Sequence, residues 1–579
     1  MGKKRNKAQS SKEIVPKALG PKSREKWINI MAPLAIIVCT SAVFSKVVDH
    51  LFVNWDDISY ITQNLLIRDF SAAGIAKILT TPVIGMYNPL PFLIYAAEYK
   101  FWELNPVPYM LSNVLFHLLA VLALYRFIYR LTGKYETASI VAVLFACHPM
   151  HVEVVAWASE TKTSLFVIFY FLALGEYLKY ASDGYKPRYL FYATILFIIS
   201  ALSKPEAVTL APMLVLLDYY LGRKWDGRLL LEKIPFFIIG LFFGILTFYT
   251  HIQADDDIFQ ISRNYSFINN LLVSNYSIAF YIEKLLFPIG LCAIYPYPDN
   301  TTWLPVQYYL ALPVIPFIAW LVYKSGKFRK EMIFGVLFFL ISISVLLRLV
   351  PSGFFGIANR YSYLSYTGFF FIMGQFYVYI KEGKLGYASG YKKYMQVSLG
   401  IYIAFCLFRC NKRIDVWQNS VTLFTDVINM QPKFAIGYDM RSSAKYQFGD
   451  MAGAIQDVSK AIELDSTCVR SYNNRTAYKW LVKDYDGAFR DCAKALSLDA
   501  NSVAAYVNRS SLNASLGRWH EAMTDDSICI KLNPKEAGAY YNMALVKMAL
   551  YDTASAVVYM KTADELGYPR DRNFLFVSK

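Results

Sequence analysis

Residues 231–250 read LEKIPFFIIGLFFGILTFYT, a run whose only charged residues are Glu232 and Lys233. A helix of this length rises about 30 Å, the thickness of the hydrocarbon core of a bilayer. Further apolar runs lie at residues 28–48, 108–130, 136–157, 162–180, 188–203, 205–221, 305–323, 331–350, 360–380 and 393–410. The sequence therefore predicts an all-α, polytopic transmembrane helix bundle of about eleven spans over residues 27–410, with an outer loop at 49–107.

A twelfth apolar run, 266–290, contains Glu283 and Lys284 together with three asparagines, and charges at membrane depth are costly. It either spans while facing the bundle interior or lies at the interface. Residues 1–26 carry nine Lys or Arg against two acids, which predicts a basic cytoplasmic tail. With eleven crossings the basic loops at 324–330 and 381–393 are also cytoplasmic, whereas twelve would place both outside. Eleven crossings are therefore predicted, and they put the C-terminal domain outside the cytoplasm.

Composition agrees with a membrane protein, because 56% of the residues are hydrophobic, against about 45–50% in soluble domains. The net charge of +16 comes from basic residues spread over a tail and short loops. Nucleic-acid binding needs such residues on one folded face, so no nucleic-acid partner is expected. The eight cysteines include no CxxC pair and no metal-ligand spacing.

Residues 411–579 contain a 34-residue repeat, the period of the tetratricopeptide (TPR) helix–turn–helix. The repeated columns are Tyr438, Tyr472, Tyr506 and Tyr540; Ala454, Ala488, Ala522 and Ala556; Arg441, Arg475 and Arg509; and Leu464, Leu498, Leu532 and Leu566. Trp417 to Pro432 falls into phase as a second helix alone. A TPR α-solenoid with a concave surface for a peptide or protein partner is predicted. The tyrosines and alanines are interpreted as packing residues, and the arginines as either solvated or lining the groove.

Polar residues gather in the segments that the eleven-span topology places outside. They are Asp56 and Asp57 after the first span; His148, His151, Glu153, Glu160 and Lys162 after the third; Lys204 and Glu206 after the fifth; and Arg360 and Tyr361 before the tenth. Such groups suit chemistry on a lipid-linked phosphate substrate, or an ion pathway. Simpler readings remain open: the acidic pair could cap a loop helix, and His148 could be a packed helix-end residue. His148, His151 and Glu153 are also compatible with a divalent metal.

Five stretches in this order resemble a known family: FVNWDD (52–57), HPMHVEVVAWASETK (148–162), LSKPEAVTLAPMLVLLDYYLG (202–222), LLFPIGLCAIYPYP (285–298) and ANRYSYLS (358–365). They are similar to segments of bacterial relatives of the transmembrane, TPR-containing protein O-mannosyltransferases, which have the GT-C fold. Two positions depart from the family pattern. Asn359 stands where an acid is common, and ETKT replaces ERKD, so that Thr163 takes the place of an acid.

The resemblance implies an inverting glycosyltransferase of a bacterial inner membrane. It would move mannose or a similar hexose from a polyprenyl phosphate to an extracytoplasmic acceptor, such as protein Ser/Thr, held by the TPR domain. It implies Asp56 and Asp57 as catalytic residues. It implies Lys204, Arg360, His148, His151 and Lys162 at the donor phosphate, and Glu153, Glu160, Glu206 and Tyr361 at the substrate. No cofactor is required by it, and a non-enzymatic membrane scaffold or transporter that docks partners through the TPR array is the alternative.

Overall fold

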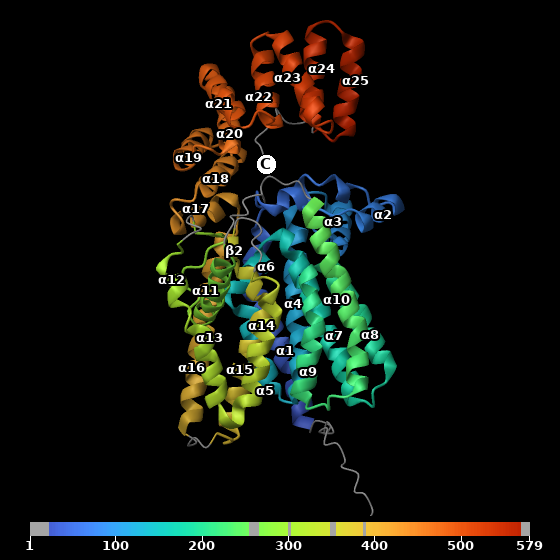
Figure 1. The fold of residues 1–579 in the computed structure, drawn as a ribbon, viewed down its shortest axis with the longest axis vertical. Coiled ribbons are helices and arrows are strands. Elements are labelled where there is room, and N and C mark those ends of the chain that lie inside the picture. Colours follow the sequence, from blue (N-terminus) through green and yellow to red (C-terminus); the bar gives the residue numbers. More distant parts are fainter. Residues whose placement is uncertain (1–22, 254–265, 299–302, 348–354, 386–389, 569–579) are drawn as a thin grey trace, which may run out of the picture. The chain divides into compact units, whose positions relative to one another are not determined.

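The computed structural model describes residues 23–253, 266–298, 303–347, 355–385 and 390–568 (Figure 1). These residues form two compact units. The membrane unit contains residues up to His50, Ser59–Ile61 and Leu66–Asp415. The repeat unit contains Leu51–Ile58, Thr62–Leu65 and the chain from Val416 onward. Two pieces of the predicted outer loop thus group with the repeats, and residues 1–22 of the predicted tail lie outside the described residues.

Long helices make up the membrane unit. They are α1 (Ser23–Val43), α4 (Pro106–Thr132), α5 (Tyr135–Cys147), α7 (Thr161–Ser182), α8 (Pro187–Ser203), α9 (Leu210–Leu221), α10 (Gly227–Gln253), α11 (Phe267–Leu286), α13 (Val314–Lys324), α14 (Arg329–Ser344), α15 (Ser362–Lys381) and α16 (Gly390–Val416). Shorter elements are α2 (Ala72–Thr80), α3 (Pro89–Trp102), α6 (Val152–Ala156), α12 (Val306–Leu310) and the antiparallel pair β1 (Tyr295–Pro296) and β2 (Phe355–Ile357). The predicted all-α fold class is confirmed.

Five described segments are long and apolar enough to cross a membrane: Ile30–Asp49, Pro106–Thr132, Ala158–Ser182, Gly227–Ile252 and Val306–Lys324. Tyr135–Cys147 and Pro149–Ala156 would together form a sixth, with a bend of 56° between them. Every apolar run used in the prediction contains a helix, and the multi-pass bundle is confirmed. The count of eleven includes shorter helices such as Pro187–Ser203 and stays a prediction.

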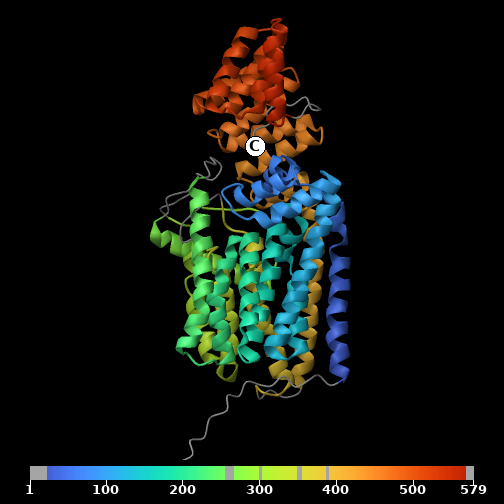
Figure 2. The same ribbon diagram turned by 90° about the vertical axis from the view of Figure 1, so that its right-hand side faces the viewer.

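The surface and the interior of the bundle differ in the way a lipid environment requires. Ile30 and Val38 of α1 and Phe248 of α10 are each more than 60% exposed, and α1 lies at an edge of the bundle (Figure 2). Inside, α14 and α15 approach so closely that a Cβ atom added to Gly368 would lie 2.1 Å from the Gly335 carbonyl oxygen. Only glycine permits this contact.

The twelfth candidate run forms α11, which is not among the segments that pass the test for crossing. Its Asn269, Asn270 and Asn275 are buried within the membrane unit. Tyr281 of α11 donates a hydrogen bond to the Ala358 carbonyl oxygen at 3.0 Å. The helix therefore fixes the backbone two residues before Arg360, whether or not it crosses the membrane.

The repeat unit is a stack of helix pairs, as predicted. The pairs are α18 (Ala435–Gln447) with α19 (Met451–Leu464), α20 (Val469–Leu481) with α21 (Tyr485–Leu498), α22 (Val503–Ser515) with α23 (Trp519–Leu532), and α24 (Ala537–Ala549) with α25 (Thr553–Glu565). The half-unit is α17 (Ser420–Met430). Each alanine of the repeated column is buried, which confirms its packing role.

The repeated arginines have a structural role that the sequence did not indicate. Each arginine forms a two-pronged ion pair with an aspartate sixteen residues later, on the second helix of its own pair. Arg475, for example, donates to the two carboxylate oxygens of Asp491 at 2.7 and 2.8 Å. The carboxylates thus hold these arginines within the helix pair, while their side chains stay 17–35% exposed, and whether they also line a groove stays a prediction.

Asp526 of α23 predicts a pH dependence of stability. Its carboxyl group is fully buried beside Ser510 and Asn542, and burial, together with the charge of Asp525, raises its pKa to about 8. An unfolded aspartate has a pKa near 4, so the folded state binds the extra proton between about pH 4 and pH 8. The unfolding free energy of the repeat unit should therefore fall as pH rises through that window, by up to about 1.4 kcal/mol per unit.

The measurement is urea unfolding of the full chain at pH 5, 7 and 9, monitored by a spectroscopic probe placed in α23. Asp526→Asn should remove the slope and be more stable than the wild type at pH 9. Asp491→Asn, which removes a paired carboxylate, should lower stability equally at all three values. An unchanged slope in Asp526→Asn would contradict the assignment.

Candidate functional site

The sequence-predicted polar residues of the membrane unit lie on short turns between helices. Residues 149–160 between α5 and α7 form two 3₁₀ turns around α6, Lys204 ends α8, Glu206 lies in the 3₁₀ turn Pro205–Thr209, and Arg360 lies in the 3₁₀ turn Asn359–Tyr361. Pro149 and Pro205 each start a turn, where a missing backbone N–H is tolerated. These turns bring together side chains more than 200 residues apart in sequence.

Arg360 joins two buried carboxylates. Its guanidinium donates a hydrogen bond to Glu153 and lies 3.5 Å from a Glu160 oxygen. The Trp157 ring lies 5.3 Å from the guanidinium carbon, in the range of a cation–π interaction. Both glutamate side chains are about 1% exposed and Arg360 is 10% exposed. Arg360 is therefore more exposed than either of the two glutamates that it contacts.

Glu160 is at the centre of this cluster. Lys162 lies 3.3 Å from one of its oxygens, and the Thr163 hydroxyl donates a hydrogen bond to the other. Lys204 donates to the Thr163 hydroxyl and pairs with Glu206, both at 3.0 Å. We call the set Glu153, Glu160, Lys162, Thr163, Lys204, Glu206 and Arg360 the charged cluster.

Burial of the charged cluster destabilises the folded state. Removing ions from water costs several kcal/mol each, and replacing a buried ion pair by apolar residues is often neutral or stabilising. Three cations and three carboxylates, all at most 16% exposed, are therefore poorly explained by stability alone. Perturbed charged groups gathered in this way are typical of functional sites.

Two aromatic residues that sequence reasoning missed complete the cluster. The ammonium of Lys162 lies 4.4 Å from the centroid of Tyr60 and 5.8 Å from that of Trp157. Trp157 lies inside the quoted 148–162 stretch, so its position in the motif could have indicated it. Tyr60 had no such signal. Tyr361, which was predicted, is buried with its ring 5.5 Å from the Arg360 guanidinium carbon.

The two histidines are packed in the bundle core. His148 interacts with the Leu285 carbonyl oxygen at 3.3 Å, and His151 with the Phe145 carbonyl oxygen at 2.7 Å. Both are fully buried against Tyr366 and Phe370, and His151 also contacts Tyr363. This burial favours the helix-end packing reading of His148, and phosphate binding by either histidine stays a prediction.

A divalent metal on His148, His151 and Glu153 is not supported. Over the described ranges, no group of three or more His, Cys, Asp or Glu side chains has the geometry to hold a metal ion. The physical reason is that one ring nitrogen of each histidine faces a backbone carbonyl oxygen, His148 Nδ1 accepts from the Met150 amide, and Glu153 faces Arg360.

The two departures from the family pattern have structural roles. Thr163 connects Glu160 to Lys204 through its hydroxyl, as described above. The Asn359 amide donates to the Cys292 carbonyl oxygen at 2.7 Å and accepts from the Tyr295 hydroxyl at 2.9 Å. Asn359 thus fastens the turn that carries Arg360 to the segment that contains β1.

The acidic pair lies in the repeat unit. Asp57 is buried, and its carboxylate accepts a hydrogen bond from the Val53 amide at 2.9 Å, which closes the loop 53–57. Asp57 precedes the π-helical turn Ile58–Thr62 but makes no side-chain capping bond to it, so the capping interpretation is wrong for this residue. Asp56 is half-buried. The two carboxylates are therefore not equivalent.

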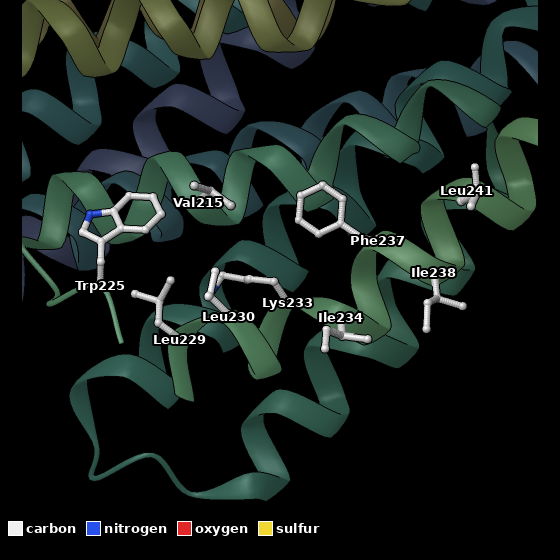
Figure 3. A pocket seen from close by; sticks show the side chains of 9 residues that line it. All are labelled: Val215, Trp225, Leu229, Leu230, Lys233, Ile234, Phe237, Ile238 and Leu241. Carbon is white, nitrogen blue, oxygen red and sulfur yellow. The ribbon is translucent and has the colours of Figure 1, made fainter. Parts of the chain in front are cut away.

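A lipid-facing groove of about 370 Å³ lies between α9 and α10 (Figure 3). It is lined by apolar side chains, including Val215, Trp225 and Phe237. The one charged group, Lys233, is paired with Asp218 at 2.6 Å. The groove shares no residue with the charged cluster and offers no reactive group.

Residues 88–253 match the family model of dolichyl-phosphate-mannose-protein mannosyltransferases. Protein O-mannosyl-transferase F38B6.6 of Caenorhabditis elegans is 27% identical over 140 residues, 24% of this chain and 19% of that protein. Protein O-mannosyl-transferase TMTC3 of Mus musculus is 33% identical over 93 residues, 16% of this chain and 10% of that protein. The matches thus span less than a fifth of the length of these relatives. They confirm the predicted resemblance for the part of the chain that contains Glu153 to Glu206.

Two solved structures are similar to parts of this chain. The crystal structure of ArnT from Cupriavidus metallidurans bound to undecaprenyl phosphate is 13% identical, with a TM-score of 0.35 over 71% of this chain and 81% of that chain. The crystal structure of MamA is 20% identical, with a TM-score of 0.23 over 25% of this chain and 86% of that chain.

Proposed function

We propose that this protein is an inverting membrane glycosyltransferase of the GT-C type. Its donor is a polyprenyl-phosphate-linked hexose, with mannose as the first candidate, and its acceptor is a protein Ser/Thr hydroxyl bound by the repeat unit. The observation that carries the proposal is the charged cluster, in which Lys162, Lys204 and Arg360 surround Glu160. Much of the cluster lies within the segment that matches the mannosyltransferase family model.

The cluster residues suit the leaving group of such a transfer. As the bond between the sugar and the phosphate breaks, negative charge develops on the polyprenyl phosphate, and cations held in a dry site stabilise it strongly. Lys204 has a third ammonium proton beyond those used by Thr163 and Glu206. Arg360, which is more exposed than the two glutamates it contacts, would donate to a phosphate that arrives from the lipid.

Asp56 is proposed as the base. The acceptor hydroxyl oxygen attacks the anomeric carbon, its proton passes to the Asp56 carboxylate, and polyprenyl phosphate leaves from the opposite face, so the anomeric configuration inverts. Asp56 is half-buried, whereas Asp57 is buried and bonded to Val53.

The test is transfer of radiolabelled mannose from a polyprenyl-phosphate-mannose donor to a Ser/Thr-containing protein, using the purified chain in lipid nanodiscs. Labelled protein that releases the sugar by β-elimination, with inverted anomeric configuration, would support the proposal. The rival is a scaffold or transporter that docks partners through the repeats. Partner binding without any transfer from several polyprenyl-phosphate hexoses would favour that rival.

The proposed location of the repeat unit is outside the cytoplasm of a bacterial inner membrane. Val557 of α25 is 68% exposed, so Val557→Cys in a Cys468→Ser background places a reactive thiol on the repeats. An impermeant maleimide is expected to label this variant in intact cells, whereas the background variant alone gives the baseline. Labelling only after the cells are opened would require twelve crossings and would contradict the location.

A further inference from the structure

We propose that the repeat unit holds the acidic pair in position, and that Asn54 and Ser420 are the positioning residues. This inference rests on the proposed function and adds to it a second task for the repeats. The TPR array would not only bind the acceptor but also carry the loop that supplies the base.

The first argument is the set of hydrogen bonds between the loop and the first two helices of the repeat unit. The Asn54 backbone amide donates to the Ser420 hydroxyl at 2.8 Å, and the Asn54 side-chain amide donates to the Met440 carbonyl oxygen of α18 at 2.9 Å. Upstream, the Leu51 amide donates to the Gln418 carbonyl oxygen at 2.9 Å. Asn54 is 5% exposed and Ser420 is 3% exposed, so water does not compete for these bonds.

The second argument is that the residue that accepts the hydrogen bond from the Asn54 amide, Ser420, lies in a rigid turn. Asn419 caps α17 by accepting from the amides of Val421 and Thr422, and the Thr422 hydroxyl accepts from the Asn419 amide. This reciprocal capping box fixes the first turn of α17, where Ser420 is the first residue. The Ser420 hydroxyl therefore presents a fixed acceptor to Asn54.

The third argument is a contact at the far end of the same segment. A Cβ atom built on Gly567, just after α25, would lie 2.9 Å from a methyl carbon of Leu65, so the two residues are in contact, although Leu65 is 56% exposed. The stretch from Asn54 to Leu65, which contains the acidic pair, is thus fastened to the first and the last helices of the array. Between these fastenings, Asp57 accepts from Val53 and shapes the loop itself.

These contacts predict that the loop loses its position when Ser420 loses its hydroxyl. In Ser420→Ala, the Asn54 amide has no acceptor, and we expect amide hydrogen exchange of residues 51–58 to become about tenfold faster, since one net hydrogen bond is worth about 1–1.5 kcal/mol. We expect kcat for sugar transfer to fall by a similar factor, with the KM for the acceptor protein unchanged. Ser420→Thr keeps the hydroxyl and should restore both quantities.

The matched control is Ser442→Ala. It removes another buried serine hydroxyl from the repeat unit, one that donates to the Asp439 carbonyl oxygen within α18 and lies 3.5 Å from the Tyr478 hydroxyl. It should leave exchange of residues 51–58 unchanged. A purely structural effect of Ser420 would change exchange throughout the repeats and would raise the acceptor KM as well.

Three results would overturn the inference. The first is that amide exchange of residues 51–58 in Ser420→Ala equals that of the wild type. The second is that this exchange becomes faster in Ser420→Ala but kcat falls no more than it does in Ser442→Ala. The third is that Ser420→Thr fails to restore the wild-type exchange rate. Failure of the proposed function is recognised separately, as a wild-type protein that transfers no sugar, and the exchange experiment still decides whether the repeats position the loop.

Discussion

Asp56→Asn is expected to lower kcat for sugar transfer by about a hundredfold to ten-thousandfold, the range usually lost with a general base. Asparagine has nearly the same shape as aspartate but cannot take the proton of the acceptor hydroxyl. Because Asp56 is half-buried in a loop, binding of the acceptor protein to the repeats should change little. The measurement is single-turnover transfer together with a binding assay on the same sample.

Two further variants serve as a control and as a comparison for Asp56→Asn. Asp49→Asn removes an exposed carboxylate seven residues earlier and should leave transfer unchanged. Asp57→Asn retains an oxygen that can accept from the Val53 amide, so it should cost less than Asp56→Asn. If Asp57→Asn abolished transfer while Asp56→Asn remained active, the base would be Asp57.

Arg360→Lys is expected to lower kcat about a hundredfold to a thousandfold, the loss typical of one donor to a developing negative charge. Lysine keeps the charge but has no planar fork, so it cannot face Glu153 and Glu160 together. Arg409→Lys, in α16, removes a guanidinium that donates to the Pro288 carbonyl oxygen and should have little effect on transfer.

A double variant separates catalysis from stability. Arg360→Met alone leaves two buried carboxylates without their partner and should unfold at a lower temperature. Combining it with Glu153→Gln removes one of those charges and should recover part of the thermal stability, whereas transfer should remain absent. Recovery of transfer in the double variant would show that Arg360 only balances Glu153.

The sequence predicts the architecture well where a period or a composition decides it. A 34-residue repeat with alanines in a fixed column predicts stacked helix pairs. Long apolar runs predict helices that cross a lipid bilayer. Even the half-unit α17 follows from the phase of the repeat. The number of membrane crossings is harder to predict from the sequence. Short helices such as α9 and polar helices such as α11 do not meet simple criteria of length and hydropathy.

The site was predicted as a set of residues but not as a geometry. Motif order indicated Glu153, Glu160, Lys162, Lys204 and Arg360, which the fold brings together. It could not indicate that Thr163 bridges Glu160 and Lys204, since a threonine has no charge to draw attention. Nor could it separate Asp56 from Asp57, because the burial of Asp57 and its hydrogen bond with the Val53 amide are set by the fold.

Solenoid proteins commonly change length by gaining or losing whole repeats, since each repeat contacts only its neighbours. Here Asn54 contacts the start of the array and Leu65 contacts Gly567 at its end, and eleven residues of chain cannot extend beyond about 40 Å. A helix pair inserted between α21 and α22 would increase the distance between these two anchors and break one of them. The copy number of the repeats is thereby constrained, and under the proposed function a change of acceptor preference would come from substitutions within the existing repeats.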